Sequence, residues 1–503
     1  MNRRVSAMAR VTGVVAAALF TVAYASGTAT AAAPVKEPAS TPVNVVLVEG
    51  QTYSYVLNVK QANPGQMMLA ERAVTDAGGV VVQAWPQIGV VVAHSTHVTF
   101  KADVMKLAKG NSVVSIGLTR GVPVIEGTPT GTGPTGNGAI GKGQLGAITA
   151  MSIGDDQILS VVPDPFESPY QWDMTMIRAD QAHEITDGSP TVLVGVLDSG
   201  IDGDHVDLAS QIDRADSVNC TIAGVPDTSP QGWYPTSSPH GTHVAGTIAA
   251  ARNGIGMVGV APAVKLASIK VVNDDGWIYP EYAICGFVWA GLHGVDVTNN
   301  SYYIDPFEYW CSDQPDQAAV KEAVRRAVDF STAQGAVHAA AAGNSSTDLA
   351  NKTIDAGSPD DWATPVVRTI NNGCQDIPSE LPGVVTVSSI TQDSLLSAFS
   401  SRGLNVVDVA APGQQIASTY PGGRWVYMSG TSMASPHVAG VLALMKSAHP
   451  NWTPAQMEKA IETQAIDLPC PATAIGGAAC VGTTAKNSYY GEGIVNALAA
   501  VQP

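Results

Sequence analysis

Residues 191–202 read Thr-Val-Leu-Val-Gly-Val-Leu-Asp-Ser-Gly-Ile-Asp, and this stretch decides the fold class. Its apolar run, Val192 to Leu197, does not alternate with polar residues, which indicates a strand covered on both faces of a parallel sheet. Asp198 follows at the carboxyl end of that strand, where open α/β sheets place their ligands. An acid beside Ser-Gly also suits a plain turn, so this stretch alone leaves the role of Asp198 open.

Similar apolar runs recur along the chain and alternate with helical patterns. Candidate strands lie at 266–272, 295–301 and 383–389, and candidate helices lie at 281–292 and 316–334. This alternation predicts a doubly wound α/β fold, with a mostly parallel sheet and helices on both of its faces.

A second motif places a histidine at the start of a helix. Ser238-Pro-His240-Gly-Thr-His243-Val-Ala-Gly246 puts His240 in a Gly-containing turn, before a run of small residues suited to tight burial. His240 and His243 could also bind a metal, but the Glu of the zinc motif His-Glu-x-x-His and a third ligand are missing. Two buried core histidines are the plainer alternative.

A third motif adds a serine. Ser429-Gly430-Thr431-Ser432-Met-Ala-Ser-Pro-His437 places Ser432 between a Gly turn and another helix of small residues. A serine hydroxyl becomes a nucleophile only beside a base that an acid orients. Asp198, His240 and Ser432 offer these three groups, each at the end of an element.

The three motifs resemble the signatures of the subtilisin-like serine peptidases, and they occur in that family's order of Asp, His and Ser. The resemblance extends from Trp172 to Val501. It implies that Ser432 attacks the peptide carbonyl, that His240 takes and returns the proton, and that Asp198 orients His240.

The resemblance implies further site residues. Val337-His-Ala-Ala-Ala-Ala-Gly343-Asn344 is similar to the strand that ends in the family's oxyanion-hole asparagine, so Asn344 is expected to donate a hydrogen bond to the oxyanion. By the same resemblance, the pocket for the residue before the cut bond is lined by Ser301, Tyr302, Tyr303, Ala341, Ala342 and Gly343. Because Tyr303 stands where relatives commonly have glycine, we expect a narrowed pocket that favours small or slender side chains.

Calcium is the one cofactor that the resemblance raises, in a structural role, and none is required for the chemistry. Asp207 and Asn253 fall at positions like those of a calcium site in the family, and the loop 251–257 has the length to offer backbone oxygens. A further ligand expected before Trp172 is not evident. The alternative is a solvated acid and a turn asparagine.

The first third of the chain predicts export and processing. Arg3, Arg4 and Arg10 precede an apolar run at 11–25, which indicates a cleaved signal peptide at 1–33. Residues 34–126 contain the pattern strand, helix, two strands, helix, strand, which predicts a small ferredoxin-like α+β domain. By family analogy this domain resembles an inhibitory propeptide that assists folding.

A polar segment rich in Gly and Pro follows at 127–168 and indicates a linker. Its G-x-G-x-x-G matches lack the flanking strand and helix that a dinucleotide site needs. The peptidase domain is therefore assigned to 169–503.

Composition agrees with a folded, exported protein. Hydrophobic residues make up 45% of the 503 and charged residues only 14%, which argues against a disordered chain. The 26 basic and 43 acidic residues give a net charge of −17, which argues against a nucleic-acid partner. No stretch after the signal is long and apolar enough to span a membrane.

The chain has six cysteines, the first of them at position 220, and export would allow them to oxidise. Many pairings are open from the sequence alone. The resemblance to larger exported members and the placement of the loops favour Cys220–Cys285, Cys311–Cys374 and Cys470–Cys480.

The sequence therefore predicts a secreted serine endopeptidase that works through an acyl-enzyme and is made as an autoprocessed precursor. Its expected partners are polypeptide substrates and its own propeptide. An esterase elbow, G-x-S-x-G, is excluded because Ala434 replaces the second glycine. A catalytically silent binding protein on the same scaffold is the alternative, although silent relatives should lose at least one of the four chemical groups.

Overall fold

A four-stranded antiparallel sheet with two helices forms the first part of the described chain, which comprises residues 37–124 and 170–503 of a computed structural model. Its elements follow in the order β1 (Tyr53–Val59), α1 (Pro64–Asp76), β2 (Gly79–Trp85), β3 (Val90–Ser95), α2 (Phe100–Ala108) and β4 (Val113–Leu118). The strand order β2-β3-β1-β4 is that of a ferredoxin-like unit, as the sequence predicted. The expected signal peptide and linker lie outside the described residues.

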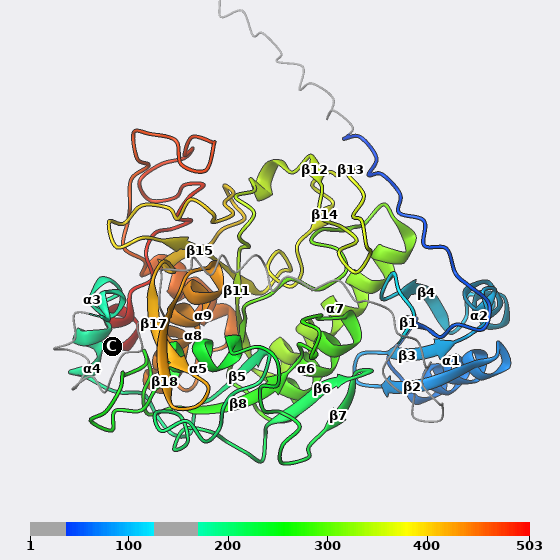
Figure 1. The fold of residues 1–503 in the computed structure, drawn as a ribbon, viewed down its shortest axis with the longest axis horizontal. Helices are drawn as coiled ribbons and strands as arrows, with labels where there is room; N and C mark the ends of the chain where they lie inside the picture. Colours follow the sequence, from blue (N-terminus) through cyan, green and yellow to red (C-terminus); the bar gives the residue numbers. More distant parts are fainter. Residues whose placement is uncertain (1–36, 125–169) are drawn as a thin grey trace, which may run out of the picture. The chain divides into compact units, whose positions relative to one another are not determined.

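A mostly parallel sheet of eight strands forms the centre of the second part (Figure 1). Its order is β16-β15-β11-β9-β5-β8-β6-β7, and all neighbours pair in parallel except β6 and β7. The strands are β5 (Leu193–Asp198), β6 (Val218–Ile222), β7 (Val225–Asp227), β8 (Lys265–Lys270), β9 (Val297–Asn300), β11 (Val337–Ala341), β15 (Val384–Ile390) and β16 (Val409–Pro412). This confirms the predicted α/β sheet, to which the structure adds an antiparallel edge strand.

Both faces of this sheet are covered by helices, as the apolar run in β5 predicted. Val194 and Val196 point into the core shared with α5 (His240–Ala249) and α8 (Thr431–Ala448). Leu193 and Leu197 point into the core shared with α6 (Pro280–Leu292) and α7 (Pro315–Gln334). Because successive side chains of a strand face opposite ways, a strand buried on both sides needs an unbroken apolar run.

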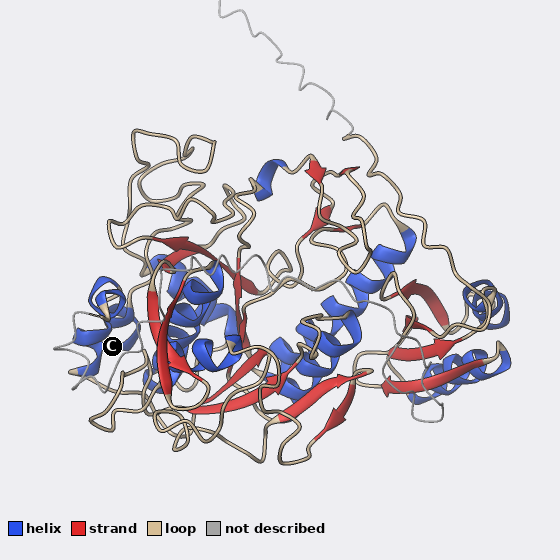
Figure 2. Ribbon diagram, in the orientation of Figure 1, coloured by secondary structure: helices blue, strands red, loops and turns tan. Residues whose placement is uncertain are grey.

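The remaining elements are short or peripheral (Figure 2). They are α3 (Trp172–Met176), α4 (Ala179–His183), β10 (Trp310–Cys311), η2 (Leu349–Asn351), β12 (Ile354–Asp355), β13 (Arg368–Thr369), β14 (Cys374–Gln375), the hairpin β17 (Ile416–Tyr420) and β18 (Arg424–Met428), α9 (Pro454–Thr463) and α10 (Ala497–Val501).

The ferredoxin-like sheet packs on α6 and α7 within one compact unit that begins at Pro38. The contact is close because Gly117 of β4 has no side chain: a methyl group there would lie 3.0 Å from a methyl carbon of Val320. A buried ion pair joins the two parts, in which Arg120 donates to Glu281. Ser54 of β1 donates a second hydrogen bond, of 3.0 Å, to the same carboxylate.

Three disulfides, Cys220–Cys285, Cys311–Cys374 and Cys470–Cys480, link all six cysteines in the pairs expected from the sequence. The first ties β6 to α6, and the second closes the two-residue ladder between β10 and β14. The first therefore fixes a strand of the central sheet to a covering helix, and the second joins two segments outside that sheet.

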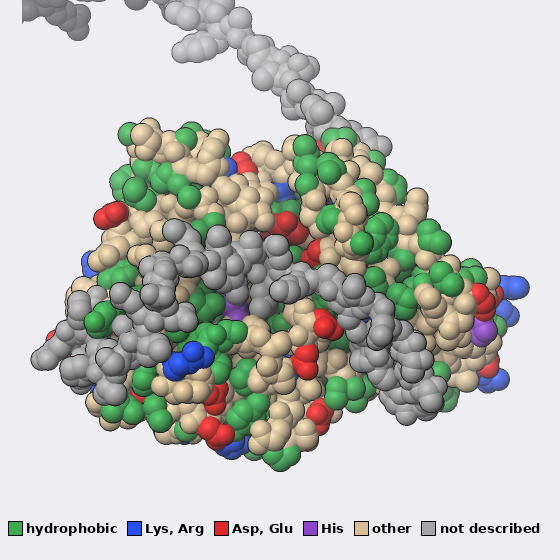
Figure 3. Space-filling model, in the orientation of Figure 1, with side chains coloured by type: hydrophobic (Ala, Val, Ile, Leu, Met, Phe, Trp, Pro, Cys, Tyr) green, Lys and Arg blue, Asp and Glu red, His purple; other side chains and the backbone are tan. Residues whose placement is uncertain are grey.

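In the part of the chain that the structure describes, the search for membrane spans finds no helix with the necessary length and apolar character. On the face drawn in Figure 3, the described surface is mostly hydrophobic or uncharged, and its charged side chains are scattered.

Candidate active site

His240 and Asp198 meet at the carboxyl end of β5. The Nδ1 atom of His240 lies 2.9 Å from both Oδ1 and Oδ2 of Asp198, and both side chains are buried. Gly241 allows this approach, since a methyl group there would lie 2.5 Å from the carbonyl oxygen of Gly200. A carboxylate on Nδ1 orients the imidazole and leaves Nε2 as the nitrogen that can accept a proton. Among the described residues, Nε2 has no hydrogen-bond partner.

Ser432 is the second residue of α8, where the positive end of the helix dipole favours developing negative charge. Its hydroxyl donates to the carbonyl oxygen of Ser301 at 3.3 Å, and Ser301 Oγ donates to the carbonyl oxygen of Ser432 at 3.0 Å. Pro436 explains the second bond, because it has no N–H to offer the carbonyl four residues earlier. The serine is therefore joined to the segment predicted to line the substrate pocket.

Asn344 lies at the start of the same helix. Its Oδ1 accepts hydrogen bonds from the backbone N–H of Thr431 at 2.8 Å and from Thr431 Oγ1 at 2.9 Å. Because the amide oxygen is engaged in this way, the amide group is oriented, and its nitrogen is the donor that faces Gly430. A methyl group on Gly430 would lie 3.6 Å from that nitrogen. The side-chain nitrogen of Asn344 is therefore a hydrogen-bond donor beside Gly430, just before Thr431 and Ser432.

The pocket-lining segments predicted from the sequence attach to the same helix start. Gly343 donates its N–H to Thr431 Oγ1 at 3.2 Å, while Ser301 contacts Ser432 as described above. Ala341 and Ala342 are buried. Tyr302 donates to Asn300 Oδ1 at 3.1 Å, and Tyr303 donates to Asp360 Oδ2 at 2.7 Å, so hydrogen bonds hold both tyrosine rings.

His243 does not face the site. Its Nε2 lies 3.1 Å from the carbonyl oxygen of Ile416 and 3.2 Å from that of Val426, which ties α5 to the β17–β18 hairpin. Burial lowers the pKa of His243 to about 3, so it is neutral at ordinary pH. It is the core histidine that the sequence left as an alternative.

A second buried histidine–aspartate pair lies behind the serine, and the sequence reasoning missed it. His437 Nε2 lies 2.9 Å from Asp173 Oδ2, and His437 Nδ1 lies 2.8 Å from the carbonyl oxygen of Met433. The pair joins α3 to α8. His437 lies within the serine motif and Asp173 lies in no motif, so the sequence does not predict this pair.

Asp207 and Asn253 lie together, but the groups around the Asp207 carboxylate do not fit a calcium site. Asp207 accepts N–H bonds from Asn253 Nδ2 at 3.0 Å, from the backbone of Met257 at 3.0 Å and from the indole of Trp425 at 2.8 Å. A calcium ion needs oxygen ligands that face it, whereas three N–H groups point at this carboxylate. The sequence hypothesis of a calcium site here is therefore not supported by the geometry.

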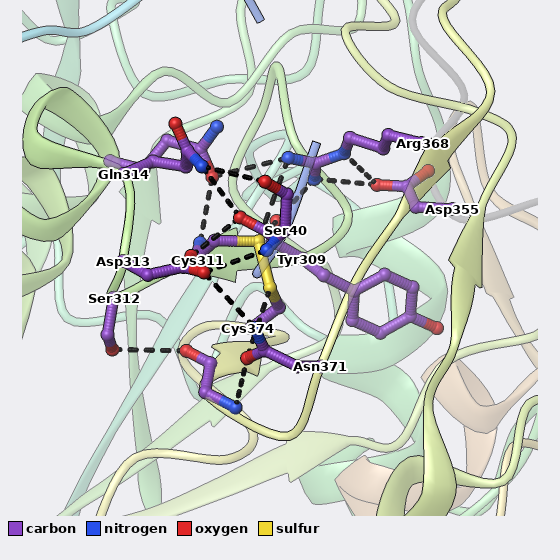
Figure 4. Close-up of a disulfide and its surroundings, with 12 residues drawn as sticks. Ser40, Tyr309, Cys311, Ser312, Asp313, Gln314, Asp355, Arg368, Asn371 and Cys374 are labelled. Atoms are coloured by element: carbon purple, nitrogen blue, oxygen red, sulfur yellow. Dashed lines mark hydrogen bonds and ion pairs between the residues drawn. A yellow bond between two sulfur atoms is a disulfide. The ribbon is translucent and has the colours of Figure 1, made fainter. Parts of the chain in front are cut away.

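Within residues 37–124 and 170–503, one group of side chains has the spacing of metal ligands: Cys311, Asp313 and Cys374. Figure 4 shows why it does not act as such, since the two sulfurs are bonded to each other. Asp313 accepts hydrogen bonds from the backbone N–H of Ser40 at 2.8 Å and from its hydroxyl at 2.5 Å. These groups hold the N-terminal segment on the β10–β14 ladder.

The family model described as the subtilase family matches residues 189–493. Subtilisin E of Bacillus subtilis (strain 168) is 34% identical over 330 residues, which cover 65% of this chain and 70% of the relative. A subtilisin of Bacillus pumilus is also 34% identical over 330 residues, covering 65% of this chain and 98% of the relative.

Two solved structures share the fold. The epidermin leader peptide processing serine protease of Staphylococcus aureus has a TM-score of 0.63 at 20% identity, covering 90% of this chain and 98% of that one. Fervidolysin of Fervidobacterium pennivorans, a keratinolytic enzyme, has a TM-score of 0.60 at 23% identity. The match covers 91% of this chain and 62% of the fervidolysin chain.

Proposed function

The chain belongs to the subtilase family of serine endopeptidases, and from this premise we propose that it is an exported peptidase that hydrolyses peptide bonds through an acyl-enzyme at Ser432. Subtilases act on polypeptides and need no cofactor for their chemistry. The observation that carries the proposal is the hydrogen bond between His240 and Asp198, together with the position of Ser432 as the second residue of α8.

In the proposed reaction, Ser432 Oγ attacks the carbonyl carbon and gives its proton to His240 Nε2. The tetrahedral oxyanion accepts hydrogen bonds from the Asn344 amide and from the Ser432 backbone N–H, and its collapse releases the amine with the proton from His240. Water then repeats the sequence on the acyl-enzyme. Asp198 keeps Nδ1 protonated, and the described bond of Ser432 to Ser301 would have to be exchanged for one to His240.

We also infer that residues 34–126 act as the inhibitory propeptide, behind a signal peptide at 1–33 and ahead of the linker at 127–168. The ferredoxin-like unit and its buried Arg120–Glu281 contact with α6 support this inference. The disulfides agree with export.

A structural calcium ion at Asp207 and Asn253 is left out of the proposal, because N–H donors surround that carboxylate. A melting temperature that rises with added calcium and falls with a chelator would bring it back.

The proposal is tested by replacing Ser432 with alanine in the full-length precursor. We expect hydrolysis of casein and release of the propeptide to stop, with a loss of about 10⁶-fold in kcat, a magnitude carried over from subtilisins. Ser435→Ala is the matched control, since Ser435 is buried on the same helix and bonds Asn299 at 2.7 Å. Equal activity of the wild type and Ser432→Ala would contradict the mechanism. A wild type without activity would favour the silent binding protein.

A further inference from the structure

Asp376 lies between the two segments that line the predicted substrate pocket. The residue after it, Ile377, accepts a hydrogen bond of 3.1 Å from the backbone N–H of Ile304, which continues the segment Ser301 to Tyr303. On the other side, a methyl group built on Gly343 would lie 3.6 Å from Asp376 Oδ2. Gly343 directly precedes Asn344, so the carboxylate lies within one residue of the expected oxyanion hole.

One oxygen of this carboxylate is unsatisfied. Asp376 is 3% exposed, and its Oδ1 is buried without a hydrogen-bond partner among the described residues. A buried acceptor of this kind destabilises the folded protein, and more so when it is charged, unless something pairs with it. An unsatisfied oxygen on a carboxylate beside the predicted substrate pocket points to a donor that arrives with the substrate.

The neighbouring charges do not supply that donor. Glu380 Oε2 accepts the backbone N–H of Asp376 at 2.7 Å, and Glu308 accepts Ser345 Oγ at 2.8 Å. The ammonium of Lys352 is bonded to Glu380 at 2.5 Å and to the carbonyl oxygen of Leu349 at 2.6 Å. Asp376 thus has two carboxylates and one lysine as charged neighbours, and burial together with Glu380 and Glu308 raises the pKa of Asp376 well above its usual range.

We propose that Asp376 is the specificity-determining residue of the pocket and that the enzyme cleaves after lysine or arginine, an inference that rests on the proposed function. A guanidinium or ammonium group would donate to Oδ1 and would balance the excess negative charge. Lysine and arginine also have long, slender side chains, which agrees with the narrowed pocket expected from Tyr303.

The test uses the mature enzyme from the full chain and peptides that differ only at the residue before the cut bond: arginine, lysine, alanine, phenylalanine or glutamate. We expect kcat/KM for arginine and lysine to exceed that for alanine and phenylalanine by about 30-fold or more, as for a buried charge pair. In Asp376→Asn this advantage should disappear, so that kcat/KM for arginine and lysine falls to the value that the same variant shows for alanine. Asp408→Asn is the control, because Asp408 bonds the backbone N–H of Thr386 and lies outside the proposed pocket.

A second measurement needs no variant. Mass spectrometry of casein fragments made by the wild type should find new carboxyl termini that are mainly lysine or arginine. Fragments that end in aromatic or aliphatic residues, or an arginine preference that survives Asp376→Asn, would overturn the inference and leave the proposed function intact. If the wild type produces no fragments, both fail together, and the Ser432→Ala comparison identifies that case.

Discussion

Asp376 gives the proposed selectivity a pH dependence that is separate from catalysis. Its pKa is raised mainly by burial and then by Glu380 and Glu308, while Lys352 opposes the shift. Below that raised pKa the carboxyl group is neutral and cannot pair with a cation. We therefore expect the ratio of kcat/KM for arginine to kcat/KM for alanine to rise with pH through this pKa and then level off.

The ratio isolates Asp376 because both substrates use the same catalytic groups, so the pH dependence of catalysis cancels. Asp376→Asn provides the control and should give a flat ratio. A wild-type ratio that is also flat from acid to alkaline pH would count against a titrating group in the pocket.

Residues with a local signature could be predicted from the sequence, and residues defined by distant neighbours could not. Asp198, His240 and Ser432 stand in motifs whose spacing carries their chemistry. Asp376 stands in a plain Asp-Ile-Pro, and it lies beside Gly343 only after the insertion at residues 345–381 has folded back. Asp173 could not be predicted either, because only folding brings it to His437.

At the scale of elements, the Cys311–Cys374 disulfide fixes the position of the chain just before Asp376. Cys374 lies opposite Cys311 in the β10–β14 ladder, two residues before Asp376. Misplacing a substrate-binding group by about 1 Å can cost as much as 10²-fold in rate. We expect the double variant Cys311→Ser/Cys374→Ser to lose about tenfold or more of its arginine selectivity while it still cleaves the alanine peptide.

Cys220→Ser/Cys285→Ser is the control for this prediction. That disulfide spans 65 residues and ties β6 to α6, so its loss should cost about 4 kcal/mol of unfolding free energy without changing selectivity. Thermal unfolding and the peptide ratio measure the two effects. Equal loss of selectivity in both double variants would mean that general loosening, and not the position of Asp376, is the cause.

The long elements were predictable because a strand buried on both faces leaves an unbroken apolar run in the sequence, and a helix buried on one face leaves a helical period. The candidate strand at 266–272 is observed at Lys265–Lys270, and the helix expected at 316–334 is observed at Pro315–Gln334. The two-residue strands β10 and β14 leave no such period. They form because a disulfide and Arg368, which is ion-paired with Asp355 at 2.7 Å, hold the insertion in place.

At the scale of the whole molecule, the Arg120–Glu281 pair should govern how firmly the ferredoxin-like unit is held. Both side chains are almost fully buried, at 1% and 0% exposure, so removing Arg120 leaves a buried charge without its partner. We expect Arg120→Met to weaken the interface by about 3–5 kcal/mol. Faster amide hydrogen exchange in β1 and β4 of the full-length Ser432→Ala precursor is the measurement.

Two comparisons sharpen this prediction. Arg72→Met removes an exposed pair with Asp76 and should leave exchange unchanged. Arg120→Met combined with Glu281→Met should lose less than Arg120→Met alone, because no unpaired charge remains. Unchanged exchange in Arg120→Met would show that apolar contacts alone hold the unit.

The binding of the segment that begins at Pro38 should depend on the Cys311–Cys374 disulfide. Asn371 donates to the carbonyl oxygen of Pro38 at 3.0 Å, and Asp313 binds Ser40, so the segment holds residues on both arms of the Cys311–Cys374 bridge (Figure 4). Without the disulfide, Asp313 and Asn371 are no longer held at a fixed separation, so we expect the segment to be bound less firmly in a copy with mispaired cysteines than in a correctly bonded one.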